Sequence, residues 1–170
     1  MQLGYVSLKG RGANDRFLVD IAAGLQGRLR LCGTVQTNIE RADRRKCDMD
    51  LRVLPDGPAL RISEDRGAAA RGCTLDAGVL EEAVLAVQAR LDGAELLIVN
   101  KFGKQECEGR GFAPVIGEAL GRGLPVLVGV NGLNLPHFET FAEGLAQPLQ
   151  ADIAAVTEWC LRAVGQRHVA

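Results

Sequence analysis

An excess of charge of either sign is missing from this sequence. Its 170 residues include 20 Lys and Arg against 21 Asp and Glu, which gives a formal net charge of −1. Because no overall field would steer the chain onto nucleic acid or an anionic membrane, we expect neither as a partner, and any anion site must be local. The hydrophobic fraction of 47% suits a packed core, and the length predicts one domain over residues 1–170.

Long apolar runs and paired cysteines are missing as well. No basic segment followed by an apolar stretch opens the chain, and no run approaches the ~20 residues of a membrane-spanning helix, so we expect neither secretion nor membrane insertion. The cysteines are odd in number, scattered and without a CxxC pair: Cys32, Cys47, Cys73, Cys107 and Cys160. They indicate neither a disulfide framework nor a zinc site. We expect reduced thiols in the cytoplasm, with Cys47 and Cys73 not disulfide-bonded.

No familiar catalytic constellation is present either. His137 and His168 stand apart from any nucleophile or carboxylate pattern, and no Ser/His/Asp, Cys/His or paired-carboxylate arrangement is seen. The phosphate-binding pattern GxxxxGK[ST] is also missing, and no hydroxyl is placed to hold magnesium. We therefore assign no catalytic residue and no metal ligand.

Apolar patterning predicts strands alternating with helices. Strands are expected over Leu3–Leu8, Arg28–Thr37, Glu95–Val99 and Pro125–Val130. Helices are expected over Phe17–Leu25, Asp76–Leu91 with Asp76 as N-cap, Gly109–Arg122, Leu135–Leu145 and Ile153–Val164, where Trp159 is a packing residue. This alternation predicts an α/β fold in three layers around a mostly parallel sheet.

The middle of the chain interrupts that alternation. Met49–Leu54 alternates as a half-buried strand does, and the turn residues Pro55–Pro58 separate it from Ala59–Ile62. We expect an antiparallel hairpin inserted in the parallel sheet. The segment Ile39–Lys46 is too charged for the core and is expected to be a loop.

A glycine-rich turn follows the first predicted strand and is a candidate anion site. It consists of Lys9, Gly10, Arg11, Gly12 and Asn14 with the intervening alanine. Ligands of open α/β sheets bind beyond the carboxyl ends of strands, and the next helix would direct free amides there. A plain glycine-rich turn is the alternative, because such spacings are permissive.

The loop after Val99 is the second candidate. A magnesium-dependent NTPase would place an acidic pair here, whereas this chain has Asn100 and Lys101. Gly103, Lys104 and Arg110 follow, and their cations would compensate an anion directly. The alternative is that these are solvated loop charges.

This loop carries a resemblance to the small nucleoside-triphosphatases related to the human cancer-related NTPase. Their signature resembles V-I-D-E-I-G-K-M-E, and Gly103, Lys104 and Glu106 match it here. Asn100 stands at the metal-holding Asp of that signature and Lys101 at its catalytic Glu. The resemblance implies a P-loop-NTPase-like sheet that lacks both acidic groups.

A bacterial family of unknown function is similar over more of the chain. The similarity covers Gln36–Asn38, Cys47–Leu51, Arg61–Ser63, Cys73–Asp76 and Asn100–Gly111. This family resembles a degenerate branch of the same triphosphatases and is often associated with molybdate uptake. The resemblance implies a molybdate, tungstate or nucleotide ligand and a possible protein partner in molybdate uptake, with homo-oligomerisation open.

Three functions follow as expectations. The first is a non-hydrolytic protein that binds an oxyanion, molybdate or a nucleotide phosphate, through the two loops. The second is an atypical nucleoside-triphosphatase in which Glu106 or Glu108 replaces the missing metal ligand. The third is a regulatory module that docks on a transporter or enzyme without a small ligand.

Overall fold

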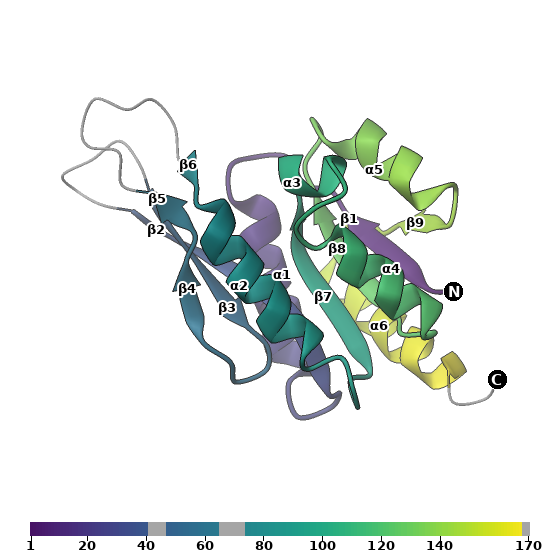
Figure 1. The fold of residues 1–170 in the computed structure, drawn as a ribbon. Coiled ribbons are helices and arrows are strands. Elements are labelled where there is room, and N and C mark those ends of the chain that lie inside the picture. Colours follow the sequence, from purple (N-terminus) through teal and green to yellow (C-terminus); the bar gives the residue numbers. More distant parts are fainter. Residues whose placement is uncertain (41–46, 65–73, 168–170) are drawn as a thin grey trace.

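The computed structural model describes residues 1–40, 47–64 and 74–167, and forms a seven-stranded sheet covered by helices on both faces (Figure 1). The strands of this sheet are β1 (Leu3–Val6), β2 (Leu31–Glu40), β3 (Cys47–Val53), β4 (Ala59–Arg61), β7 (Leu96–Phe102), β8 (Val126–Val130) and β9 (Ala146–Pro148). A second, two-stranded sheet consists of β5 (Ser63–Glu64) and β6 (Thr74–Leu75). The helices are α1 (Ala13–Leu25), α2 (Ala77–Gln88), α3 (Lys104–Cys107), α4 (Ala113–Gly121), α5 (Leu135–Ala142) and α6 (Ile153–Arg167).

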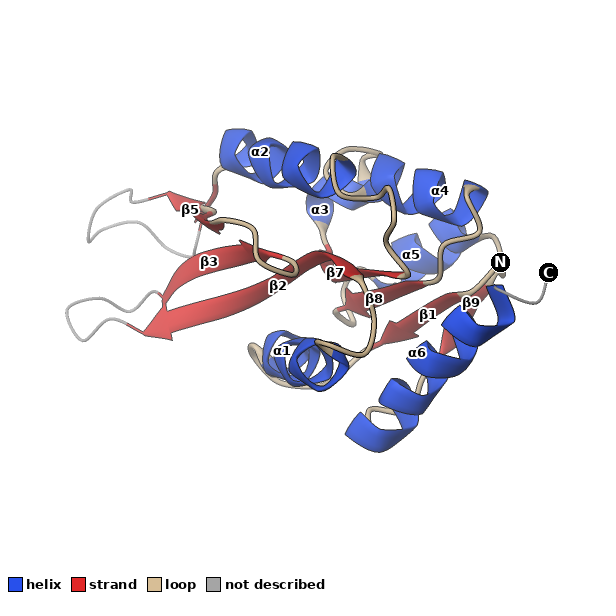
Figure 2. Cartoon of the chain, turned by 90° about the horizontal axis from the view of Figure 1, so that it is seen from below, coloured by secondary structure: helices blue, strands red, loops and turns tan. Residues whose placement is uncertain are grey.

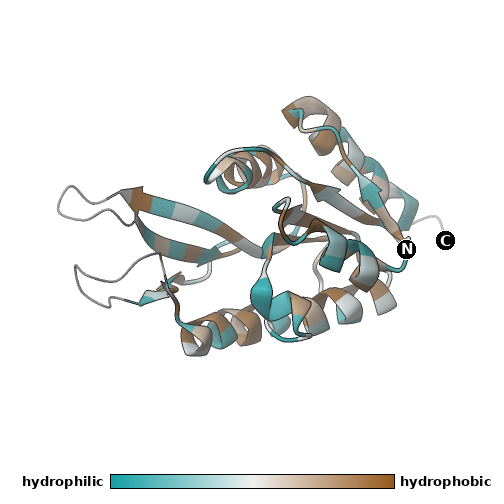
Figure 3. Cartoon of the chain, turned by 90° about the horizontal axis from the view of Figure 1, so that it is seen from above, coloured by the Kyte–Doolittle hydropathy of each residue, from teal (hydrophilic) through white to brown (hydrophobic). Residues whose placement is uncertain are grey.

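The strand order β4-β3-β2-β7-β8-β1-β9 confirms the mostly parallel sheet with an antiparallel part. Strands β2, β7, β8, β1 and β9 are parallel to one another, whereas β3 is antiparallel to both β2 and β4. All five residues of β8 are buried, as expected for a central strand with helices on both faces. The hairpin strands instead alternate between hydrophobic and hydrophilic residues (Figure 3).

The helices form two layers. Helices α1 and α6 cover one face, and α2, α3, α4 and α5 lie on the other (Figure 2). Two apolar cores result, one joining Leu18 and Ile21 of α1 to Trp159 of α6, and the other joining α2 and α4 to the opposite face of β7 and β8. Among the described helices, none combines the length and apolarity that crossing a lipid bilayer requires.

Several local predictions are confirmed. Asp76 caps α2, since its Oδ1 accepts hydrogen bonds from Gly78 N at 2.9 Å and Val79 N at 3.1 Å. Trp159 is a packing residue with 6% of its surface exposed, and its Nε1 donates to Gln147 Oε1.

Other predictions were wrong in their boundaries. Ile39 and Glu40 belong to β2 because they pair with β3, so the prediction of a loop was wrong for these two residues. The rest of that segment, residues 41–46, lies outside the described structure. The predicted helix Gly109–Arg122 begins only at Ala113, and the short helix α3 precedes it. The loop between them is folded around a buried carboxylate, which helical periodicity does not reveal.

Strand β2 changes partners at Gly33. It pairs with β7 over Leu31–Gly33 and with β3 over Thr34–Glu40. Gly33 has φ 113°, and a Cβ there would lie 1.9 Å from Ile98 O, so only glycine fits this close approach. Beyond Gly33 the β2–β3 hairpin therefore leaves the edge of β7 as an arm (Figure 2).

Candidate ligand-binding site

A β-bulge near the end of β7 directs the side chains of the second predicted loop. The pairing of β7 with β8 runs from Val99↔Val128 to Phe102↔Val130, so two residues of β7, Asn100 and Lys101, lie opposite a single residue of β8. Gly129 lies opposite the bulge, where a Cβ would come within 2.3 Å of Asn100 O. The bulge leaves Asn100 2% exposed and Lys101 exposed.

Asn14 fixes the glycine-rich turn through hydrogen bonds of its side-chain amide. Asn14 Oδ1 accepts from Leu8 N at 2.9 Å, and its Nδ2 donates to Val130 O at 3.0 Å. The Asn14 amide thus ties the ends of β1 and β8 to the first turn of α1. Gly12, with φ 67°, precedes that helix without a side-chain cap. Asn14 therefore shapes the turn instead of facing a ligand.

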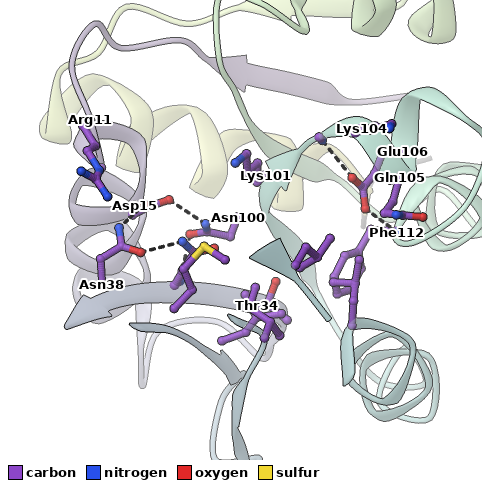
Figure 4. Close-up of a pocket in the computed structure, with 18 residues that line it drawn as sticks. Arg11, Asp15, Thr34, Asn38, Asn100, Lys101, Lys104, Gln105, Glu106 and Phe112 are labelled. Atoms are coloured by element: carbon purple, nitrogen blue, oxygen red, sulfur yellow. Dashed lines mark hydrogen bonds between the residues drawn. The ribbon is translucent and has the colours of Figure 1, made fainter. Parts of the chain in front are cut away.

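A closed network of side chains joins α1 to β2 and β7 (Figure 4). Asp15 Oδ1 accepts from Asn100 Nδ2 at 2.8 Å, and Asp15 Oδ2 accepts from Asn38 Nδ2 at 2.6 Å. Gln36 Nε2 donates to Asn38 Oδ1 at 2.7 Å, while Gln36 N donates to Asn100 Oδ1 at 2.9 Å. Asn100 is consequently held through both of its amide atoms, and the carboxylate in this region belongs to Asp15.

Glu106 organises the loop after β7. Its Oε2 accepts from Gly103 N at 2.8 Å and its Oε1 from Phe112 N at 2.9 Å. Burial raises the pKa of the Glu106 carboxyl although the backbone hydrogen bonds and Lys101 oppose that shift. Gly111 has φ 56°, and a Cβ there would approach Glu106 Oε1 to 2.2 Å, so glycine makes room for the carboxylate.

The two candidate loops open onto one cavity of about 390 Å³ (Figure 4). Its charged and polar lining includes Arg11, Asp15, Thr34, Gln36, Asn38, Asn100, Lys101, Lys104, Gln105 and Glu106. Its apolar lining consists of Met49, Leu51, Ile62, Leu75, Leu80 and Phe112. Gly12 and Gly103 contribute backbone atoms to the lining. The cavity thus combines cations from both loops with an apolar wall to which β3, β6, α2 and the N-cap of α4 contribute.

Six of the ten predicted ligand residues line this cavity: Arg11, Gly12, Asn100, Lys101, Gly103 and Lys104. Lys9, Gly10, Asn14 and Arg110 do not. Arg110 instead forms an ion pair with Glu108. Strand β8 lies between β1 and β7, so the two loops do not leave adjacent strands. They still converge, since Asp15 in the first turn of α1 accepts a hydrogen bond from Asn100 of β7.

Sequence reasoning missed Asp15, Thr34, Gln36 and Asn38. A signal was present, because the polar residues at alternate positions 34, 36 and 38 lie on one face of a strand. Asp15 gave a weaker signal as an acid in the first turn of a helix. Its contact with Asn100, 85 positions away, had no local signature.

The donor set does not fit the magnesium ion that P-loop triphosphatases use. Asp15 contributes one carboxylate, and both of its oxygens already accept amide hydrogens. Glu106 uses both oxygens for backbone amides. Among residues 1–40, 47–64 and 74–167, no three His, Cys, Asp or Glu side chains gather as a metal-binding group. A hard cation would need several such oxygens.

Comparisons with known proteins agree with this fold. A family described as "Protein of unknown function (DUF2478)" matches residues 3–159. The molybdenum import ATP-binding protein ModC 2 of Bradyrhizobium diazoefficiens is 31% identical over 147 residues, which are 85% of this chain. This chain spans only 16% of the length of that relative.

Two solved structures share the fold. The crystal structure of THEP1 from the hyperthermophile Aquifex aeolicus superposes with a TM-score of 0.62 at 13% identity, covering 89% of this chain and 90% of that one. The solution structure of a human cancer-related nucleoside triphosphatase gives a TM-score of 0.62 at 12% identity, covering 100% of this chain and 99% of that one. At such identities the likeness establishes the fold, which is that of the small P-loop triphosphatases.

Proposed function

The chain belongs to the DUF2478 family of proteins of unknown function, and we propose that it binds an oxyanion without hydrolysing a nucleotide. The ligand is molybdate or the phosphate group of a nucleotide. One observation carries this proposal: Arg11 from the first loop and Lys101 and Lys104 from the second line the same cavity. Cations that line one cavity favour the binding of an anion there.

The arrangement of charge inside the cavity determines which end an anion would occupy. Asp15 lies at the end where α1 meets β7, and its negative charge repels an anion there. Lys101 and Lys104 are exposed, and in Figure 4 Lys104 lies on the far side of Asn100 from Asp15. Lys104 Nζ is 4.0 Å from Glu108 Oε1, a loose contact that an anion can replace. The oxyanion therefore belongs at the mouth, beside the two lysines.

The absence of hydrolysis follows from the chemistry of the same residues. Asn100 is a neutral amide where the triphosphatase signature has its metal-holding Asp, and Lys101 replaces the acid that would orient water. Glu106, which we considered as a substitute metal ligand, is engaged by two backbone amides. Glu108 is engaged by Arg110.

The 31% identity with a molybdenum import protein supports molybdate as one candidate ligand. On this proposal the chain would serve molybdate uptake or homeostasis as an accessory binding protein. The alternative ligand, a nucleotide phosphate, is supported by the shared fold.

The test is a thermal-shift and calorimetric panel of phosphate, sulfate, molybdate, tungstate, ATP and GTP, with and without magnesium. A ligand at a hundred times its dissociation constant should stabilise the fold by about 2.7 kcal/mol. The double variant K101A/K104A should lose this stabilisation while its unliganded melting temperature stays unchanged. Lys9→Ala is the matched control, because Lys9 is a lysine of the other candidate loop and does not line the cavity.

Two results would overturn the proposal. The first is undiminished anion binding by K101A/K104A. The second is magnesium-dependent ATP or GTP turnover near about 1 per second that EDTA abolishes, because that rate lies in the range of ordinary enzymes.

A further inference from the structure

The cavity is larger and more apolar than a bare oxyanion requires. Its volume of about 390 Å³ falls within the ~300–1,000 Å³ that is typical of sites for organic ligands. Its apolar wall is formed by Met49 and Leu51 of β3 together with Ile62, Leu75, Leu80 and Phe112. Met49 and Phe112 are the side-chain types that make favourable contacts with flat rings. An inorganic anion at the mouth would leave this wall uncovered.

Thr34 provides a second and independent indication. Its side chain lies on β2 at the inner wall of the cavity and is 0% exposed (Figure 4). Thr34 Oγ1 is the one buried side-chain oxygen or nitrogen in the described part of the chain that has no hydrogen-bond partner. Buried polar groups in native proteins are almost always paired, so an unpaired hydroxyl that lines a cavity calls for an external partner.

The neighbours of Thr34 on the same strand face show the contrast. Gln36 and Asn38 also line the cavity, and both are satisfied by the network around Asp15. The hydroxyl of Thr34 thus remains as an unused donor and acceptor at the inner wall. Lys101 and Lys104 supply the positive charge of the same cavity.

We propose that the ligand is an organic phosphate monoester whose phosphate lies beside Lys101 and Lys104 and whose ring enters the cavity to hydrogen-bond with Thr34 Oγ1. This inference rests on the proposed anion-binding function and specifies the chemical class of its ligand. Because the Thr34 hydroxyl is buried in the unliganded chain, ligand binding includes a rotation of the apolar side chains that line the cavity. The unbranched Met49 is suited to such a rotation.

The experiment compares two classes of probe by titration calorimetry. Inorganic phosphate and molybdate represent the bare oxyanions, and AMP and GMP represent monoesters whose rings carry hydrogen-bonding atoms. Phenyl phosphate, whose ring has no such atom, is the control that Thr34→Val should not weaken. We expect AMP or GMP to bind about tenfold tighter than inorganic phosphate. Thr34→Val keeps the shape of the side chain and removes the hydroxyl, so it should weaken that probe about tenfold and leave inorganic phosphate unchanged. Thr34→Ser, which keeps the hydroxyl, should retain the ring-bearing probe.

The outcomes separate this inference from the function on which it rests. If K101A/K104A weakens molybdate or phosphate binding but the ring-bearing probes gain nothing over them, the monoester inference fails and oxyanion binding stands. If K101A/K104A changes the binding of no probe, both fail. The melting temperature of unliganded Thr34→Val is a further readout: it should be equal to or above that of the parent chain. A drop of several degrees would show that the hydroxyl has a structural partner and would overturn the assignment.

Discussion

Restoring an acid at position 100 should destabilise this chain, although its structural neighbours are triphosphatases. In the Asn100→Asp variant, two carboxylates would face each other where Asn100 Nδ2 now donates to Asp15 Oδ1 at 2.8 Å. The lost hydrogen bond to a charged acceptor is worth about 1.5–3 kcal/mol. The repulsion of two charges 4 Å apart reaches about 4 kcal/mol at an effective dielectric constant near 20. Uptake of a proton by the pair limits the second cost, so we expect a total loss of about 2–4 kcal/mol near neutral pH.

Exchanging the two residues should repair the damage. In the double variant D15N/N100D, the new acid at position 100 would accept from Gln36 N and from the new amide at position 15. That amide would in turn accept from Asn38 Nδ2, so each hydrogen bond of the present network can be remade. We expect the double variant to lie within about 1 kcal/mol of the parent chain, which corresponds to a coupling energy typical of residues in one network.

Urea unfolding followed by circular dichroism measures both effects. At about pH 5 the single variant should recover part of its loss, because one proton shared by the two carboxyls restores a hydrogen bond between them. A single variant as stable as the parent at pH 7.5 would refute the network as the reason for an amide at this position. A double variant no more stable than the single one would refute the exchange.

Three further outcomes follow from other parts of the structure. Burial raises the pKa of the Glu106 carboxyl above its ordinary value of 4.5, so the stability linked to its protonated form is complete below that value and is lost as pH rises through the raised pKa. The free energy of unfolding relative to Glu106→Gln should therefore fall as pH rises above about 4.5, and a rise would contradict this. Gly33→Ala should lower the free energy of unfolding by about 3 kcal/mol or more, measured in urea, since the new Cβ would meet Ile98 O. The control Gly24→Ala in α1, where a Cβ has nothing within 4 Å, should be neutral or stabilising. Equal effects of the two substitutions would be inconsistent with the close approach at Gly33. Burial raises the pKa of the Cys32 thiol to about 11 and of the Cys160 thiol to about 12, so neither should react with a thiol reagent near pH 8 until urea unfolds the chain, and rapid labelling of the native protein would disprove this.

The main elements could be predicted from the sequence because their signals are local. The apolar run before Asn100 and the one ending at Val130 are strands with both faces buried, and each requires only its own residues to be recognised. Strand β9 had no such signal, since its three residues Ala146–Pro148 are mostly exposed and pair through their backbones.

The site was less predictable because its contacts cross the sheet. The loop positions of Lys101 and Lys104 followed from the rule that ligands bind at the carboxyl ends of strands. The role of Asn14 did not, because its amide is used by Leu8 and by Val130, 116 positions away. No pattern in a single sequence reveals a contact between residues so far apart along the chain. Cys73, whose bonding state we predicted together with that of Cys47, lies outside the described residues, so that prediction stands as made.

The change of pairing partner at Gly33 affects which part of the molecule undergoes local opening most readily. Beyond this residue, β2 no longer forms ladder hydrogen bonds with β7. Two hydrogen bonds that involve side chains connect the arm to the rest of the sheet and to α1: Gln36 N donates to Asn100 Oδ1, and Asn38 donates to Asp15. Segments attached in this way open at lower free energy than central strands, so amide protons of the arm should exchange with deuterium earlier than those of β8. Since the arm supplies Met49 and Leu51 to the cavity wall, a molecule seated there would also slow that exchange.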